Sequence, residues 1–133
     1  MAEKTLHLKV VAPDRTFYEG DVPFVEFKTI EGEMGVYPMH VPTTCIIAPG
    51  VLKIHEGNEV KMAALLSGFI EILQESITIL AESVEWPEEI DINRAKEARI
   101  RAERRLSDDA GGFDYDRAEL ALKRAIVRIN LGR

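Results

Sequence analysis

The hydrophobic pattern changes at Pro87, and this change constrains the fold more than any other feature of the 133-residue sequence. Before Pro87, short runs rich in Val, Ile, Thr and Phe are separated by turn residues, as in β-strands. After it, apolar residues recur at the spacing of an amphipathic helix. A chain of this length forms one compact domain, or a small domain with an appendage, which excludes large catalytic folds. We therefore expect a β domain at residues 1–86 and a helical domain at residues 87–133.

The first region is expected to form an antiparallel β-sandwich, although a barrel would fit the same pattern. Phe24 and Val25 begin an alternating run and should lie on opposite faces of their strand. Turn residues such as Pro13-Asp14 and Gly57-Asn58 fall between the apolar runs, where they favour hairpin turns. The predicted strands are Leu6–Val11, Thr16–Val22, Phe24–Ile30, Gly35–Tyr37, Thr43–Ala48, Val51–His55, Val60–Ser67, Gly68–Leu73 and Ser76–Ala81.

The second region is expected to form an antiparallel two-helix hairpin. Asp91 is the expected N-cap of a helix from Ile92 to about Leu106, and Asp114 that of a helix of about Tyr115–Asn130. The short Asp- and Gly-rich connection between them favours antiparallel neighbours. The facing partners predicted from the two apolar stripes are Ala95/Ile129, Ala98/Ala125, Ala102/Ala121 and Leu106/Ala118.

Alanine dominates this predicted seam, which limits its stability. Each alanine buries about one methyl group, roughly 0.8 kcal/mol, against ~1.5–3 kcal/mol for a leucine or isoleucine. Helices of this length are marginal in water without tertiary support. We therefore predict an appendage that docks, undocks or straightens according to what it binds.

Four arginines are predicted to share one edge of the hairpin. With about 100° per residue, Arg94 and Arg101 lie to one side of the first stripe, and Arg124 and Arg128 lie to the same rotational side of the second. Arginine donates paired hydrogen bonds to phosphate oxygens, and the start of the first helix adds N–H groups, so a polyphosphate would fit.

The same charges also fit a solvated helix face, and the pattern alone favours this plainer interpretation. Its support is a set of favourably spaced local pairs, namely Asp91 with Arg94, Glu97 with Arg101 and Glu119 with Lys123.

Composition and motifs exclude several functional classes. The net charge of −6 argues against general nucleic-acid binding. No apolar run approaches the roughly 20 residues that span a bilayer, and no apolar signal core follows Met1, so we expect a cytosolic chain without membrane insertion. The single Cys45 excludes an internal disulfide, and the scattered histidines predict no metal site. No Gly-rich loop ending in Gly-Lys occurs, so any polyphosphate that the arginines bind would not be hydrolysed here.

The order of these parts resembles the epsilon subunits of bacterial F-type ATP synthase over essentially the whole chain. In the sandwich, the similarity lies in Glu31–Pro42, Pro49–Ile54 and Ser67–Ile72. In the helical region, Ile90–Ala95 matches the Ile/Leu-Asp-x-x-Arg-Ala motif of the epsilon subunits that bind ATP. Met39 departs from the pattern, because many members of that family have glycine before the histidine.

The resemblance implies a site for ATP as a regulatory ligand and leaves the need for magnesium open. Ile90, Asp91, Arg94 and Ala95 would surround the base, the ribose and the helix start. The phosphates would meet Arg101, Arg124 and Arg128, and Glu85 would close the site from the domain junction.

The resemblance also implies a non-catalytic, regulatory subunit of the central stalk, at the cytoplasmic face of the membrane. Its sandwich would pack on the gamma subunit and the c-ring. Its helices would be permissive as a hairpin and would block ATP hydrolysis when extended against the alpha and beta subunits. The alternative is a structural adaptor whose hairpin only mediates subunit contacts, without sensing nucleotide.

Overall fold

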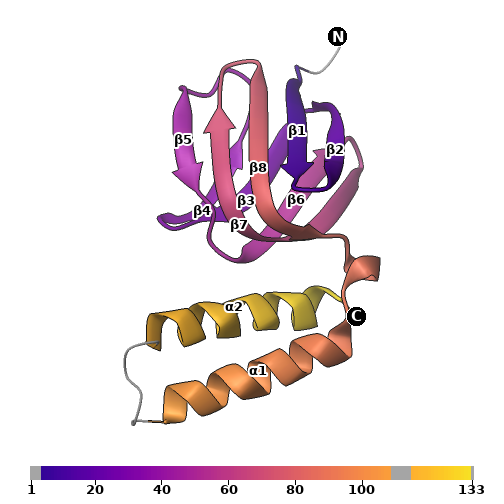
Figure 1. Cartoon of the computed structure of the whole chain (residues 1–133). Coiled ribbons are helices and arrows are strands. Elements are labelled where there is room, and N and C mark those ends of the chain that lie inside the picture. Colours follow the sequence, from indigo (N-terminus) through magenta and orange to yellow (C-terminus); the bar gives the residue numbers. More distant parts are fainter. Residues whose placement is uncertain (1–3, 109–114, 133) are drawn as a thin grey trace. The chain divides into compact units, whose positions relative to one another are not determined.

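The computed structural model describes residues 4–108 and 115–132. The chain divides into two compact units, Met1–Glu85 and Trp86–Arg133. The first unit contains strands and the second contains helices, as Figure 1 shows. The strands are β1 (Leu6–Ala12), β2 (Arg15–Val22), β3 (Phe24–Thr29), β4 (Gly32–Val36), β5 (Thr43–Ile46), β6 (Gly50–Glu56), β7 (Glu59–Ile72) and β8 (Ser76–Glu85). The helices are the short 3-10 helix η1 (Pro87–Glu89), α1 (Ile92–Ser107) and α2 (Tyr115–Leu131).

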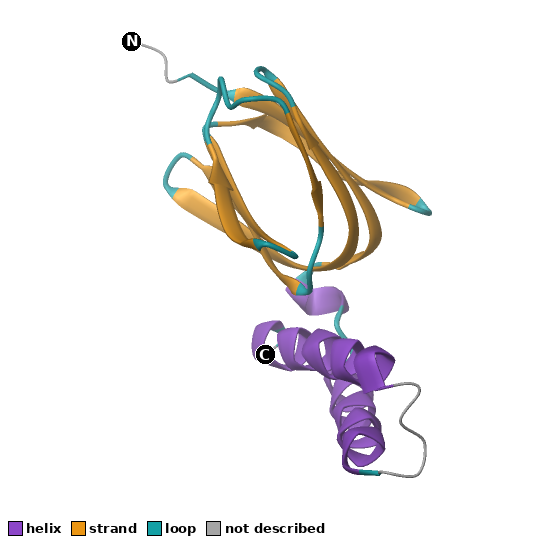
Figure 2. Cartoon of the chain, turned by 90° about the vertical axis from the view of Figure 1, so that its left-hand side faces the viewer, coloured by secondary structure: helices purple, strands orange, loops and turns teal. Residues whose placement is uncertain are grey.

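The strands form a single sheet that folds over into two facing layers, which confirms the predicted sandwich (Figure 2). The sheet has the order β2-β1-β8-β7-β6-β3-β4, with β5 paired to β7. β6 pairs with the first part of β7, whereas β5 pairs with its last residues, so β7 belongs to both parts of the sheet. One pairing departs from the expected antiparallel arrangement, because β1 and β8 run parallel. No local pattern could predict this, since the two strands come from opposite ends of the unit.

The prediction of two separate strands on either side of Ser67 was wrong. The segment forms one 14-residue strand, β7, whose register against β8 shifts between Leu65 and Gly68. Gly68 has φ +134°, and a Cβ atom there would lie 2.1 Å from the carbonyl oxygen of Leu80. Glycine is the residue that tolerates both conditions, so the strand bends here without ending.

Met39 has φ +72°. Among the residues that the structure describes, it is the only non-glycine residue with a positive φ. It lies between β4 and β5, where its N–H donates to the carbonyl oxygen of Gln74 at 2.7 Å. The left-handed region favours glycine. Met39 therefore adopts a backbone conformation that a glycine would adopt at lower cost.

The core of the first unit consists of large aliphatic side chains from the inward positions of the strands. In β3, Val25 and Phe27 are buried, whereas Phe24 is only half-buried and its ring stacks on that of Tyr37 at 4.2 Å, which confirms the predicted alternation. The fully buried residues include Leu8, Val10, Leu52, Ile54, Leu65, Leu66, Ile70, Ile72, Ile77 and Ile79.

The second unit is the predicted hairpin. Both helices end within one residue of the sequence-based prediction, at Ser107 and Leu131. The turn after α2 lies beside the start of α1, because a Cβ atom at Gly132 would be 2.9 Å from Ile90 Cγ2. The helices therefore run antiparallel (Figure 1). The predicted N-cap Asp114 and most of the connecting loop lie outside the described residues. None of the described helices combines the length and apolar character needed to cross a membrane.

Candidate functional site

The candidate site lies in the helical unit. Fewer residues are buried between its two helices than predicted. The buried residues of the two helices are Ala95 and Ala102 in α1 and Ala118 and Ala125 in α2. Each pair is seven residues apart, or about two helical turns. Ala98 and Ala121, also predicted in the seam, are only half-buried. Four methyl groups therefore form the centre of this interface.

The first turn of α1 brings together four of the predicted site residues. The Asp91 side chain caps the helix, because its Oδ1 accepts the Arg94 N–H at 3.1 Å, and its carbonyl oxygen accepts the Ala95 N–H at 3.0 Å. Ile90 precedes the cap, is buried, and donates its N–H to the carbonyl oxygen of Pro87 at 3.2 Å. Asp91 thus has a structural role, which fits its residue type at this position.

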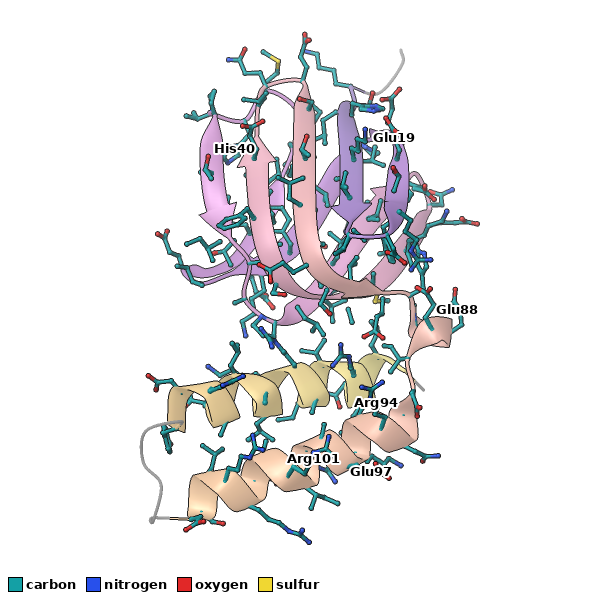
Figure 3. The ribbon with its side chains drawn as sticks, viewed as in Figure 1. Glu19, His40, Glu88, Arg94, Glu97 and Arg101 are labelled. Atoms are coloured by element: carbon teal, nitrogen blue, oxygen red, sulfur yellow. The ribbon has the colours of Figure 1, made fainter. Side chains whose placement is uncertain are left out.

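The arginines of the predicted site follow a simple positional rule. Arg94, Arg101 and Arg124 each directly precede a buried alanine, and Arg128 lies three residues after one. Both offsets place a side chain roughly 60–100° to the same side of the seam. In Figure 3, Arg94 and Arg101 lie along the side of α1 nearer to α2. The helices run antiparallel, so these four positions follow one edge of the hairpin, here called the arginine edge.

Three of the four arginines on the arginine edge are not neutralised by the charged side chains that the structure describes. Within residues 4–108 and 115–132, no ion pair is found for the side chains of Arg94, Arg101 or Arg124. The predicted pair of Glu97 and Arg101 is among those that do not form. Arg94 and Arg101 are exposed, whereas Arg124 and Arg128 are half-buried.

Arg124 carries an unsatisfied polar atom. Its Nε is shielded from solvent and has no hydrogen-bond partner among the described residues. Arg99 Nε is in the same situation but lies 3.7 Å from Glu103 Oε1, with which it forms an ion pair. Leaving a charged donor buried without a partner is costly, and charge-assisted hydrogen bonds to an anion would remove that cost.

The opposite flank of the hairpin has a different character. Glu103 and Glu119 each directly follow a buried alanine, which places them on the other side of the seam. Glu103 pairs there with Arg99, and Glu119 Oε1 lies 3.3 Å from Lys123 Nζ, which confirms the predicted pair of Glu119 and Lys123. The hairpin therefore has one ion-paired flank and one arginine edge.

Glu85, the remaining predicted site residue, belongs to the first unit. It is the last residue of β8, is half-buried, and is in register with Ala64 of β7. The structure therefore assembles the helix start and the arginine edge within one unit, and places Glu85 in the strand that precedes it.

The first unit also carries a charged cluster that residue patterns did not predict. The ring of His7 bridges two carboxylates of β2, with Nδ1 2.8 Å from Asp21 Oδ1 and Nε2 2.8 Å from Glu19 Oε2. Hydrogen bonds to Asp21 and then Glu19 raise the pKa of His7 above its usual value, and the bond from His7 lowers the pKa of Glu19. Strand register, which the sequence does not reveal, creates the cluster, since His7 pairs with Asp21 across β1 and β2.

No group of three or more His, Cys, Asp or Glu side chains is placed to hold a metal ion in the described part of the chain. Cys45 is half-buried, its Sγ lies 3.6 Å from Met34 Sδ, and burial followed by the charge of Glu31 raises its pKa. These features make Cys45 a weak nucleophile.

Comparison with known proteins covers both units. Residues 5–87 match the beta-sandwich domain of the ATP synthase delta/epsilon chain, and residues 88–131 match the long alpha-helix domain of the same chain. The chain belongs to the ATP synthase delta/epsilon family. The match includes the Ile90–Ala95 motif and both helices with their arginines.

Relatives within the delta/epsilon family are similar over almost their whole length. The ATP synthase epsilon chain of Halalkalibacterium halodurans is 43% identical over 128 residues, covering 96% of each chain. That of Caldanaerobacter subterraneus is 43% identical over 130 residues, covering 97% of this chain and 94% of the relative. A chain in the mitochondrial ATP synthase of Euglena gracilis, in a structure of OSCP, F1 and the c-ring, superposes with a TM-score of 0.79 at 25% identity, covering 92% of this chain and 78% of that one.

Proposed function

We propose that this delta/epsilon family member is the epsilon subunit of an ATP synthase central stalk, and that its helices bind ATP as a regulatory ligand. The observation that carries the nucleotide proposal is the buried Nε of Arg124 on the arginine edge, which has no hydrogen-bond partner in the part of the chain that the structure describes. A buried guanidinium nitrogen calls for an acceptor, and phosphate oxygens match the planar donor geometry of arginine.

The arrangement of the edge supports a triphosphate. Arg101 and Arg124 are exposed or half-buried and free of ion pairs with the described residues, so their donors are available. Arg94 and Arg128 would extend the same contact towards the start of α1. There, Ile90 and Ala95 would supply apolar contacts for the nucleoside, and Glu85 would close the site. Asp91 would act chiefly by holding the first turn in place through its cap.

The switching role follows from the weak seam. Four buried alanines stabilise a closed hairpin only slightly, so a ligand that binds the closed form better than the open form would shift the population strongly. We propose that the closed, ATP-bound form permits rotation. The extended form would place its basic helices against the alpha and beta subunits and inhibit ATP hydrolysis.

The partners of the sandwich are proposed from family membership. The sandwich would pack on the gamma subunit and the c-ring, in keeping with the central-stalk place of the subunit. The protein would then associate with the membrane peripherally through the complex, on its cytoplasmic face. It would act as a regulatory and coupling subunit rather than a catalytic one.

A structural adaptor without nucleotide sensing is the competing function, and the ion-paired flank favours it. There, Arg99 and Lys123 form ion pairs with Glu103 and Glu119 without any ligand. In an adaptor, the arginine edge would only contact an acidic surface of another protein.

Isothermal titration calorimetry of the whole chain with ATP separates the two functions. We expect saturable binding, and a loss of at least about tenfold in affinity for Arg101→Gln and for Arg124→Gln, because each removes charge-assisted hydrogen bonds. Arg104→Gln is the matched control, since Arg104 lies two residues after a buried alanine and so faces away from the edge. Absence of heat with ATP, with and without magnesium, would establish the adaptor. Comparing the two titrations also shows whether magnesium contributes.

A further inference from the structure

The arginine edge continues beyond the four arginines of the proposed nucleotide site. Arg117 directly precedes the buried Ala118, and Arg105 lies three residues after the buried Ala102. These are the same two offsets that place the other four arginines on the edge. The end of α1 lies beside the start of α2 in an antiparallel pair, so Arg105 and Arg117 form a third level next to Arg101 and Arg124.

This third level carries positive charge without local neutralisation. Arg105 and Arg117 are both exposed, and neither forms an ion pair with another residue of the described ranges. Glu103 and Glu119 lie on the opposite flank and are already paired, and Asp116, which precedes Arg117 in α2, forms no ion pair with the residues that the structure describes. Like charges on adjacent turns repel unless an anion lies between them.

The third level lies beyond the two levels to which the proposed nucleotide site assigns its ligand. From Arg94 to Arg105 there are eleven residues, which corresponds to about 16 Å along α1. The nucleoside and the triphosphate of the proposed site would use the first two levels, at Arg94 with Arg128 and Arg101 with Arg124. The third level then remains available in line with them.

We propose that Arg105 and Arg117 form a subsite for further phosphates, so that the arginine edge recognises linear phosphate chains longer than a triphosphate. This inference rests on the proposed function, since it extends the same site. Arginine suits such a ligand, because its N–H donors can bind the oxygens of successive phosphate groups and require no other chemical group in the ligand. A chain that contacts all three levels would also hold the two helices together along their whole length.

The test is calorimetry of the whole chain with inorganic tripolyphosphate and with long-chain inorganic polyphosphate. We expect the long chain to bind at least about tenfold more tightly, because it adds charge-assisted contacts at the third level. Arg105→Gln/Arg117→Gln should abolish this preference while retaining the binding of tripolyphosphate and ATP. The control Lys96→Gln/Arg104→Gln removes the same charge from other faces and should leave the preference intact, and circular dichroism should show both variants equally helical.

Three outcomes would overturn the subsite. They are equal affinity of the wild-type chain for both chain lengths, equal loss in the control variant, and loss of ATP binding together with polyphosphate binding in Arg105→Gln/Arg117→Gln. Failure of the nucleotide proposal gives a different result, in which ATP fails to bind but the long chain still binds through Arg105 and Arg117.

Discussion

The two units of the chain are stabilised by very different amounts of buried apolar surface. In the sandwich, side chains such as Leu52, Ile54 and Leu66 are completely buried. In the helices, the buried residues are alanines, among them Ala95 and Ala125. Since burial of apolar area is the main stabilising contribution to folding, the sandwich is expected to be stable by itself, whereas the hairpin depends on its ligands and partners.

This difference is what the proposed function requires, since it would combine a fixed part with a responsive part in one short chain. A regulatory element must have two states of similar free energy, because a ligand shifts the equilibrium only by its differential affinity. Small residues at the seam lower the stability of the closed state without preventing it from forming. Under the proposed function, the arginine edge would make the closed state sensitive to anions.

The largest expected effect is that of a core substitution in the sandwich. Leu52→Ala in β6 should lower the free energy of unfolding of the sandwich by about 2–5 kcal/mol, because it leaves a cavity at a fully buried position. Ala102→Gly in α1 is the counterpart in the hairpin and should change the stability of the sandwich very little. Urea unfolding followed by NMR signals from the strands measures both. Equal effects of the two substitutions would show that the units unfold together. This would contradict the difference in stability between the two units.

The next largest effect is the stabilisation by bound ATP, which should be confined to the helical unit. At ATP concentrations about one hundred times the dissociation constant, ligand binding stabilises the bound form by about 2.7 kcal/mol. We therefore expect amide exchange in α1 and α2 to slow by up to about one hundredfold, while exchange in β6 and β7 is unchanged. Arg101→Gln/Arg124→Gln is the control and should show no slowing. Protection that spreads equally through the strands would contradict a ligand site confined to the helices.

A smaller effect is expected at the cap of α1. Asp91→Ala removes the acceptor of the Arg94 N–H and should destabilise the hairpin by about 0.5–2 kcal/mol. Asp91→Asn retains a capping oxygen and should remain close to wild type in the absence of nucleotide. Amide exchange in the first turn of α1 without ATP measures the difference. If both variants lose the same protection, the carboxylate charge rather than the cap holds the helix start.

The smallest effect concerns the exposed cluster of His7, Glu19 and Asp21 on the sandwich. The folded-state pKa of His7 is raised, so its contribution to stability is fully present below its unfolded value of 6.5 and disappears as the pH rises through the folded pKa. The pKa of Glu19 is lowered, so its contribution is present above its unfolded value of 4.5 and disappears as the pH falls through the folded pKa. The cluster therefore stabilises the sandwich most between these two unfolded values.

His7→Gln should remove the part of the pH dependence that lies above pH 6.5, with little change elsewhere. NMR titration of the His7 ring, together with unfolding curves at several pH values, tests this expectation. A His7 ring that titrates at its unfolded value would show that the two carboxylates do not hold it in solution.

Local patterns predicted the parts of this fold that depend on local rules. The helix ends near Ser107 and Leu131 and the capping role of Asp91 followed from residue types at particular spacings. The arginine edge followed from helical geometry, since a residue that precedes a seam alanine must lie to one side of the seam. The match of Ile90–Ala95 to a known motif predicted the family.

Other features required contacts between distant segments. A glycine at position 68 suggested a break, yet β7 continues through it because β8 follows the bend. Parallel pairing of β1 with β8 and the bridging of two carboxylates by His7 depend on strand register. Which acidic residues pair with which basic ones also depended on the observed side-chain positions, since Glu119 pairs with Lys123 but Glu97 does not pair with Arg101.

The sequence by itself determined the division into strands and helices, the alanine seam and the order of the arginines along it, because these depend on the spacing of residues within one element. The tertiary structure alone decided which strands pair, how long β7 is and that Arg124 Nε is buried without a hydrogen-bond partner among the described residues. The physical reason is that periodicity specifies which face of an element is apolar, whereas register and burial depend on what the rest of the chain places against that face.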